Sequence, residues 1–402
     1  MTAADKLDTQ FDIETGKKHV DAIAEEIYRR LGPDGLEQIG RLKRISMWQQ
    51  AAKVKDADGV EEIEVTDLHG FQLAPSWDQD PEWPTIQPAA PVKITAKKPK
   101  PRAVDYQTTV VLPDPQIGYR RLEDGTLVPM QDERALDIAV QIIAHVKPQR
   151  VVNLGDTLDL SEWTSKFIVL PEFVLTTQPA LDRAQRFLAD QRANMGDTDD
   201  DRPVKKLRGN HDDRLQMAIT KNTMAAIRLR QANKPDSWPV LSWEHLLDVD
   251  EIGVEISAGY PAGRFKLADG NGRKTPLYAQ HGKVLDIVKV AKTSRHSIIQ
   301  GHTHHIAEHH MTYDVDGHPQ HVVAIASGCL ARTDGAVPST HSGEFPNGMP
   351  ARIVEDWQQC VILVHEWPDG FWSHDIVHIH DGRAVLGDRE FVSTVDLMGD
   401  PV

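Results

Sequence analysis

The segment VKKLRGNHD, residues 204–212, joins a short apolar run to a glycine that is followed by Asn, His and Asp. The same arrangement, in which polar residues follow a run typical of a buried strand, recurs along the chain. The other polar segments are Asp114-Pro115-Gln116, Gly155-Asp156-Thr157-Leu158-Asp159, Gln280-His281-Gly282 and Gly301-His302-Thr303-His304. The apolar runs are residues 108–112, 151–154, 204–207, 277–279 and 298–299. Because the loops at the carboxyl ends of strands in open α/β sheets converge on one crevice, we expect the five polar segments to meet there.

The side chains of these segments offer a mixed set of oxygen and nitrogen ligands. The candidate ligands are Asp114, Gln116, Asp156, Asn210, His281, His302 and His304. Such a set suits hard or borderline divalent ions, and we expect Mn first, with Fe, Zn, Mg or Ni as alternatives. Because these ligands exceed the needs of a single ion, we expect two ions roughly 3.5 to 4 Å apart that share one carboxylate. Asp156 is our choice for that bridge.

Glycines accompany the polar segments. Gly155, Gly209, Gly282 and Gly301 fit tight turns in which side chains and backbone come close to a ligand. Taken alone, each segment also has a simpler interpretation, such as a strand-ending turn with solvated side chains or, for His281, a histidine of the core. The joint occurrence of all five segments, in order and each after a strand-like run, favours the metal site.

These residues, in this order, resemble the calcineurin-like metallophosphoesterase superfamily over roughly residues 105–380. The resemblance implies an α/β (α+β) fold, a β-sandwich flanked by helices, and a hydrolase that uses two metal ions. It implies that the first ion is surrounded by Asp114, Gln116, Asp156 and His304, and the second by Asp156, Asn210, His281 and His302. It also implies that His211 faces the substrate, where it donates a proton to the leaving oxygen or stabilises the transition state. Asp159 would orient His211, with Asp212 as a further candidate for that role.

Two departures from the family pattern bear on this expectation. The family usually has histidine at the position of Gln116, and an amide oxygen is a weaker, neutral ligand. We therefore expect the first ion to be looser or exchangeable. Protein Ser/Thr phosphatases of the superfamily carry Arg-Gly directly after the second aspartate, where this chain has Leu160-Ser161. A phosphoprotein phosphatase is therefore not expected.

Composition places the chain among soluble enzymes. Its 402 residues allow two or three domains, hydrophobic residues make up 40%, and no apolar run approaches the roughly 20 residues that span a membrane. Residues 1–10 lack the layout of a secretory signal, and only Cys329 and Cys360 are present, so we expect a reducing, cytoplasmic setting. The formal net charge of -15 argues against a broad nucleic-acid-binding surface, although it leaves room for a local basic groove.

Residues 1–74 are expected to form a helical accessory module. Apolar residues recur at helical spacing from Val20 to Leu31, and we expect a second helix from about Leu36 to Lys53. The pair carries several arginine and lysine residues, so a helix-turn-helix module for nucleic acid is one interpretation. A structural or partner-docking helical hairpin is the preferred one. Residues 75–103 are rich in proline and end in basic residues, which is typical of an extended linker. The catalytic domain is expected over residues 104–390.

Within that domain, we expect a helix from Ala180 to Asn194 and a second helical stretch in residues 214–247. These segments interrupt the succession of strands, and we expect them to wall the crevice and select the substrate. Three strand-like runs follow the last metal segment, at residues 321–327, 360–367 and 371–379. We expect them to belong to the second sheet of the sandwich.

The sequence therefore predicts a metal-dependent phosphoesterase in which dimetal-bound hydroxide attacks a phosphate ester and His211 assists the leaving group. The helical module and the basic linker slightly favour a phosphodiester of nucleic acid or nucleotide, whereas the acidic net charge favours a small substrate. A phosphomonoesterase and a catalytically silent metal-binding scaffold are the alternatives. The presence of His211 and Asp159 argues against the scaffold, because a purely structural site needs ligands but no proton donor.

Overall fold

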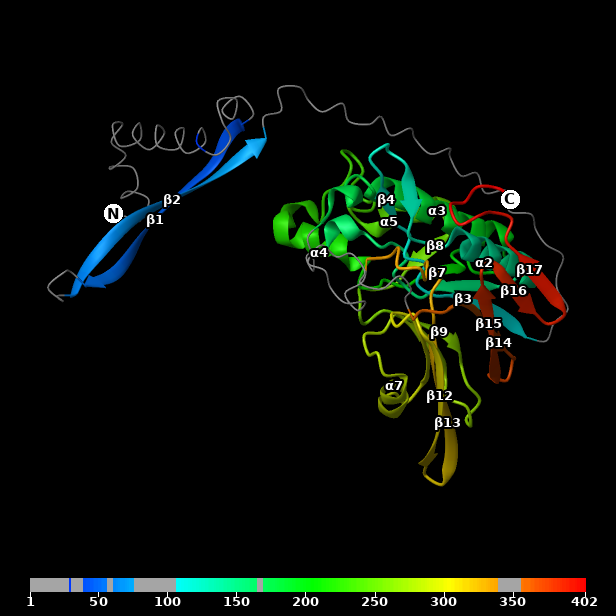
Figure 1. Ribbon diagram of the computed structural model, residues 1–402. Helices are drawn as coiled ribbons and strands as arrows, with labels where there is room; N and C mark the ends of the chain where they lie inside the picture. Colours follow the sequence, from blue (N-terminus) through cyan, green and yellow to red (C-terminus); the bar gives the residue numbers. More distant parts are fainter. Residues whose placement is uncertain (1–28, 30–38, 56–60, 76–105, 165–168, 339–355) are drawn as a thin grey trace. The chain divides into compact units, whose positions relative to one another are not determined.

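The computed structural model describes residue 29 and residues 39–55, 61–75, 106–164, 169–338 and 356–402. The chain divides into two compact units, Met1–Pro88 and Ala89–Val402 (Figure 1). The division falls within residues 75–103, the predicted linker, most of which lies outside the described residues. The domain boundaries expected from the sequence stay predictions. No helix among the described residues is long and apolar enough to cross a membrane.

The described part of the first unit is a β-hairpin. Strand β1 (Ile39–Lys55) pairs antiparallel with β2 (Glu61–Pro75), from Lys55 opposite Glu61 to Ile39 opposite Pro75. The predicted helix from Leu36 to Lys53 is therefore wrong over residues 39–53, and so is the helix-turn-helix interpretation. The partner strand has the alternation Glu62-Ile63-Glu64-Val65 that is typical of strands, and pairing with it overrides a local helical spacing. The first predicted helix lies outside the described residues except for Arg29, which is helical.

The second unit contains an eight-stranded sheet with the order β17-β16-β15-β14-β3-β6-β7-β8. Its parallel half consists of β3 (Gln107–Leu112), β6 (Arg150–Asn153), β7 (Val204–Lys206) and β8 (Val254–Ile256). Its antiparallel half consists of β14 (Gln359–Glu366), β15 (Trp372–His380), β16 (Arg383–Leu386) and β17 (Arg389–Val392).

A five-stranded sheet with the order β12-β13-β11-β10-β9 completes the main framework. Its strands are β9 (Arg264–Ala268), β10 (Leu277–Gln280), β11 (Ser297–Gln300), β12 (Ile306–Val315) and β13 (His318–Ser327). Strands β10, β11 and β13 run parallel, and β9 and β12 pair antiparallel at the edges. The ends of β12 and β13 extend as a ribbon beyond the rest of the sheet (Figure 1).

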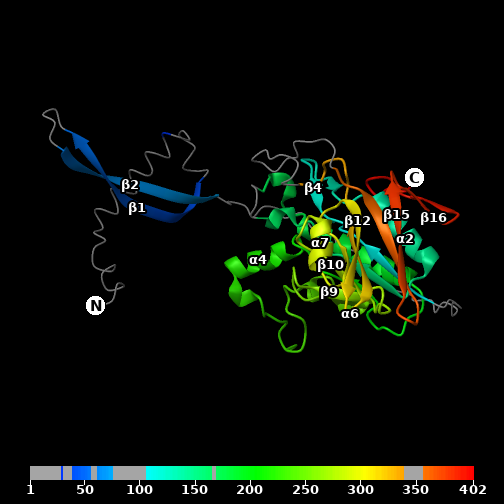
Figure 2. The same ribbon diagram turned by 90° about the horizontal axis from the view of Figure 1, so that it is seen from below.

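Alternating side chains tie these sheets into layers. In β3, Val110 and Leu112 pack in a core that includes helices α2 (Glu133–Val146) and α3 (Thr177–Asn194), whereas Val111 packs in the core between the two sheets. Helix α7 (Ile287–Thr293) covers the other side of the five-stranded sheet, where Val290 shares a core with Ile298. The order of layers is helix, sheet, sheet, helix (Figure 2).

Shorter elements fill the connections. They are β4 (Tyr119–Arg121), β5 (Leu127–Pro129), the 3₁₀ turns η1 (Ser161–Trp163), η2 (Pro171–Phe173) and η3 (Met224–Ala226), and the helices α4 (Asp213–Asn222), α5 (Trp243–Leu246) and α6 (Val249–Ile252). Both helices expected between residues 160 and 247 are confirmed, as α3 and α4. Helix α2 begins after Asp132, whose carboxylate accepts the backbone N–H groups of Arg134 and Ala135.

The mixed α/β class and all five strands that precede the polar segments are confirmed. The membership of the second sheet is not. Of the three late strand runs, only β13 belongs to the five-stranded sheet, whereas β14 and β15 join β3 in the larger one. The assignment was wrong because Val110 pairs with Leu363 far along the chain, and no local pattern encodes such a partner.

Candidate metal centre

The five polar segments meet at the end of the two stacked sheets, beyond the carboxyl ends of their parallel strands. Asp114, Asp156 and Asn210 follow β3, β6 and β7 of the larger sheet, and His281 and His302 follow β10 and β11 of the smaller one. Parallel strands end at the same edge of a sheet, and here two such edges contribute to one centre. The expected meeting of the segments is therefore observed, but the ligands come from two sheets.

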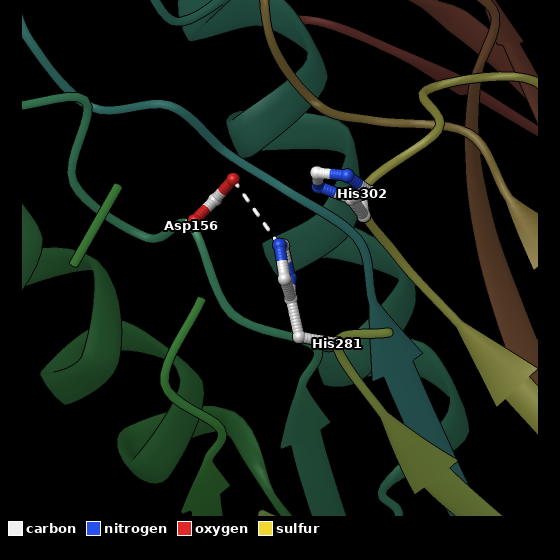
Figure 3. A group of neighbouring side chains, drawn as sticks. All are labelled: Asp156, His281 and His302. Atoms are coloured by element: carbon white, nitrogen blue, oxygen red, sulfur yellow. Dashed lines mark ion pairs between the residues drawn. The ribbon is translucent and has the colours of Figure 1, made fainter. Parts of the chain in front are cut away.

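Asp156, His281 and His302 form one group whose ligand atoms all lie within 4.8 Å of one another (Figure 3). The Nε2 atom of His281 lies 3.3 Å from Oδ2 of Asp156 and 3.1 Å from Oδ1 of Asn210. Its Nδ1 lies 3.0 Å from the backbone carbonyl oxygen of Leu154, to which it donates a hydrogen bond. This outer hydrogen bond orients the imidazole and directs Nε2 towards the centre, as is usual for metal-binding histidines.

Asp114, Asp156 and His304 form a second group of the same kind, so Asp156 is common to both. The Nε2 atom of His304 lies 3.2 Å from Oδ2 of Asp114. The amide of Gln116 lies beside this group, with Nε2 3.3 Å from Oδ2 of Asp156 and 3.4 Å from Nε2 of His304. Either group could hold a metal ion, and all their side chains are buried except that of His302, which is half-buried. All seven candidate ligands expected from the sequence are therefore brought together.

Two buried acceptors fit a cation at this place. Oδ1 of Asp114 and Oε1 of Gln116 have no hydrogen-bond partner among the described residues, and both side chains are fully buried. A buried acceptor without a partner is costly, and a bound cation would satisfy it. Rotating the Gln116 amide by half a turn exchanges its oxygen and nitrogen, which would point the oxygen towards Asp156 and His304.

The charges of the centre act on one another. Burial raises the pKa of Asp156, but His281 and His211 outweigh burial and hold the pKa well below its usual value. Burial lowers the pKa of His281, but the carboxylates of Asp156 and Asp114 outweigh burial and raise it to about 9. Burial lowers the pKa of His302 to about 4, and His281 adds to the fall. Asp156 and His302 are thus in the protonation states that bind metals, and a metal would compete with a proton at His281.

Backbone strain is concentrated in the same place. Gln116, Asp156, His302 and His304 have φ angles of 51°, 43°, 73° and 58°, in the left-handed region that residues with a Cβ adopt rarely. Strain of this kind persists where the surrounding structure enforces it, and it is enriched at functional sites. The sequence does not reveal this feature, because none of these four residues is a glycine.

Two glycines allow the loops to approach each other closely. A Cβ atom at Gly209 would lie 2.0 Å from Oδ1 of Asp156, and one at Gly301 would lie 2.3 Å from Oδ1 of Asp114. Both distances are far below any real contact, so a side chain at either position would force its neighbour to shift. At Gly209 the neighbour includes backbone, since the nitrogen of Asp156 would lie 2.4 Å away. The close approach expected of these glycines from the sequence is confirmed.

The imidazole of His211 is held on both sides. Nδ1 lies 3.0 Å from Oδ1 of Asp159, and Nε2 lies 3.0 Å from Nη2 of Arg214. Burial raises the pKa of Asp159, but Arg214 and His211 outweigh burial and lower it, so this carboxylate is ionised. Because a guanidinium only donates and a carboxylate only accepts, His211 donates from Nδ1 and accepts at Nε2. The expected contact between Asp159 and His211 is present.

Asp212 does not take part in that contact. Its buried carboxylate accepts the backbone N–H groups of Gly209 at 3.0 Å and Leu158 at 3.3 Å, and it pairs with Nζ of Lys206 at 3.0 Å. Both charged side chains have no exposed surface. The expectation that Asp212 helps to orient His211 is therefore wrong: the ion pair fixes the loop that carries Asn210 and His211.

Sequence reasoning missed two residues of this neighbourhood. Arg214 is 8% exposed and contacts both His211 and Asp159. It stands three positions after His211 at the start of α4, and that spacing could have indicated a shared face. Lys206 is fully buried in β7, and a lysine inside a strand-like run was the available signal.

The two cysteines are separate from this centre in function. Cys329 and Cys360 are free and buried, and burial raises the pKa of both thiols. Neither thiol is a candidate ligand or nucleophile, because metal binding and nucleophilic attack both require the deprotonated thiolate.

No protein-family model matches the chain. The Gene 54 protein of Mycobacterium phage D29 is similar to it, with 29% identity over 204 residues that cover 48% of this chain and 71% of the phage protein. The name of that protein describes no activity.

Proposed function

We propose that this protein is a dinuclear metal-dependent phosphoesterase that hydrolyses a phosphodiester, of the calcineurin-like type that the sequence resembles. The observation that carries the proposal is the sharing of buried Asp156 by two overlapping groups of candidate ligands. A carboxylate common to two groups is the arrangement by which two neighbouring ions are held together. The unpaired acceptors of Asp114 and Gln116 support the same interpretation.

In this proposal, Asp114, Gln116, Asp156 and His304 hold one ion, and Asp156, Asn210, His281 and His302 hold the other. When bound, a pair of divalent ions holds the phosphoryl group, provides hydroxide near neutral pH and stabilises charge in the transition state. We expect Mn first, because the ligands are oxygen and nitrogen atoms. Gln116 is a neutral ligand, so the ion beside it is the more exchangeable of the two.

His211 and Arg214 act on the substrate side of this centre. His211 holds its proton at Nδ1 against Asp159, and its Nε2 accepts from Arg214. For His211 to protonate a leaving oxygen, Nε2 must first take up a proton and the guanidinium must turn away from it. A phosphoryl oxygen is an alternative acceptor for that guanidinium, so substrate binding itself can free Nε2.

The test is Mn²⁺-dependent hydrolysis of a chromogenic phosphodiester beside the matching monoester, with Asp156→Asn as the control for contaminating activity. We expect turnover of the diester that is abolished by a chelator and by the substitution. Preference for the monoester would replace the diester proposal with a phosphatase. No turnover of either ester by protein that binds two ions would support a silent metal-binding scaffold, and full metal content in Asp156→Asn would overturn the shared ligand.

A further inference from the structure

A cavity of about 380 Å³ lies between η1 and α4 and reaches the candidate metal centre at Asn210. The residues of its wall that matter here are Trp163, Asn210, Arg214, Met217, Ala218 and Lys221. None of the sequence motifs foresaw this cavity, although the segments that form it were expected to wall the crevice. Its volume is within the range of pockets that take small organic molecules.

One face of α4 supplies a wall with charge at both ends. Arg214, Met217, Ala218 and Lys221 follow the spacing of three and four residues that places side chains on one face of a helix. The two cationic residues are two turns apart, about 10 Å along the axis. Between them lies an apolar stretch in which Met217 is 52% exposed. A ligand that fits this face has an apolar middle and negative charge at each end.

The opposite wall presents an aromatic side chain that is held in place. The indole Nε1 of Trp163 donates to Oγ1 of Thr177 at 2.6 Å, while the indole remains 37% exposed. Neighbouring Glu162 also lines the cavity, but its carboxylate accepts the backbone N–H groups of Leu175 and Thr177, at 3.1 and 2.6 Å. The acidic group of the cavity is thus engaged by the start of α3, and Trp163 is fixed beside it.

Lys221 has no ion-pair or hydrogen-bond partner among the described residues, and it is exposed. Arg214 is already turned towards the metal centre through His211 and Asp159. An anion at the inner end would therefore meet Arg214, and a second anion at the outer end would meet Lys221.

We propose that this cavity binds one nucleoside of a phosphodiester substrate, with the base against Trp163 and Met217 and a further phosphate beside Lys221. The inference rests on the proposed function, because it places the reacting phosphate at the metal centre. In a single nucleic-acid strand, each nucleoside has a phosphate on either side of its sugar and a flat base that projects from the sugar. It therefore offers two anionic ends and a stacking surface for the apolar stretch between Arg214 and Lys221. Stacking on an aromatic side chain tolerates any base, so we expect a preference for nucleotides without a preference for sequence.

The experiment compares the hydrolysis of three substrates in the presence of Mn²⁺. They are the p-nitrophenyl ester of methyl phosphate, that of thymidylate, and that of a thymidine bisphosphate with a phosphate on each side of the sugar. All three release the same chromophore, so ratios of kcat/KM report the retained group. We expect thymidylate to exceed methyl phosphate, and the bisphosphate to exceed thymidylate. Trp163→Ala should reduce the first ratio, that of thymidylate to methyl phosphate, roughly tenfold, as expected for the loss of one stacking contact. Trp163→Phe should preserve most of that ratio. The second ratio is that of the bisphosphate to thymidylate. Lys221→Gln should reduce only the second ratio, severalfold.

Trp238→Ala and Lys292→Gln are the matched controls, because both residues are exposed and lie outside the cavity wall. Hydrolysis of the methyl ester with ratios that Trp163→Ala leaves unchanged would overturn this inference and leave the proposed function intact. Selectivity that depends on Trp163 but not on Lys221 would indicate a plain aromatic ester and would also overturn it. If no ester is hydrolysed, the proposed function fails. Calorimetry then measures the binding of thymidine bisphosphate to the wild type and to Trp163→Ala and Lys221→Gln. Binding that both substitutions weaken would support the cavity, and binding that they leave unchanged would overturn it.

Discussion

The Nδ1 atom of His211 lies 3.0 Å from Oδ1 of Asp159, although 52 positions separate the two residues in the chain. This contact fixes which nitrogen of the imidazole carries the proton. Asp159 is not among the side chains that could hold a metal ion. Its role in the proposed reaction therefore acts through His211 and can be separated from metal binding.

We predict that Asp159→Asn lowers kcat for the diester by about a hundredfold or more while the metal content stays the same. The amide of Asn can donate a hydrogen bond to Nδ1 and so stabilise the tautomer of His211 that carries its proton at Nε2. Proton transfer by a positioned side chain contributes about a hundredfold or more to the rate, which sets the size of the expected loss. Kinetics and elemental analysis on the same preparation test the prediction. Asp124→Asn is the control, since that carboxylate sits in an exposed turn. A parallel loss of metal would instead make Asp159 part of the metal centre.

A second prediction concerns the contact between Gly209 and Asp156. Gly209→Ala would place a Cβ atom 2.0 Å from the carboxylate and 2.4 Å from the backbone nitrogen of Asp156, so one of the two loops must move. We expect reduced metal content and a roughly hundredfold loss of turnover, the effect of a small misplacement at a reacting centre. Gly259→Ala is the matched control, because its nearest neighbour would be 3.7 Å away. Equal behaviour of the two variants would contradict the close approach.

The buried pair of Lys206 and Asp212 should matter for stability. Lys206→Met leaves a carboxylate buried without its cation, and the free energy of unfolding should fall by about 3 to 5 kcal/mol. Lys266→Met removes an exposed pair with Asp269 and should cost at most about 1 kcal/mol. Urea unfolding of both variants tests the difference. If the two losses were alike, the pair of Lys206 and Asp212 would not fix the loop between β7 and α4.

Tyr119 predicts a dependence of stability on alkaline pH. Burial raises its pKa from 10.0 to about 12, and Glu133 adds to the rise. The phenol is neutral in both states below pH 10, whereas between pH 10 and 12 it ionises only in the unfolded chain. Its contribution, about 2 to 3 kcal/mol, is therefore present below pH 10 and lost as the pH rises towards 12.

Tyr119→Phe should flatten this part of the curve of unfolding free energy against pH. The curve is measured by urea unfolding at fixed pH values. An unaltered slope in Tyr119→Phe would show that other groups cause the decline.

Removal of residues 1–103 should spare hydrolysis of a small diester. The candidate ligands, the eight-stranded and five-stranded sheets and their cores all lie in residues 106–402. We expect kcat/KM within about a factor of two of the full chain, because the cores that position the centre stay intact. A truncated protein that keeps its secondary structure by circular dichroism but is inactive would place part of the site in the N-terminal unit.

Local signals in the sequence were enough to predict the ligand-bearing strands and the residues that follow them. An apolar run such as residues 151–154 and a glycine such as Gly209 act over a few positions, so the pattern and its consequence stand close together in the chain. The rule that parallel strands end at one edge predicts the meeting of the segments within each sheet, but not the joining of two sheets at one centre.

Long-range pairings could not be predicted in this way. The pairing of Leu363 with Val110 places β14 in the larger sheet, and the pairing of β1 with β2 replaces a helix expected from spacing alone. Arg214 was missed for a related reason: its importance depends on Asp159, which comes near it only in the folded chain.

The left-handed backbone at Gln116, Asp156, His302 and His304 lowers the stability of the fold, while the side chains of these residues belong to the candidate metal centre. A glycine would adopt each conformation more easily, so selection for thermal robustness alone would replace these residues one by one. Each replacement would relax the chain and remove a candidate ligand. These four positions therefore combine a cost to stability with side chains that could bind a metal, which is what the proposed function requires.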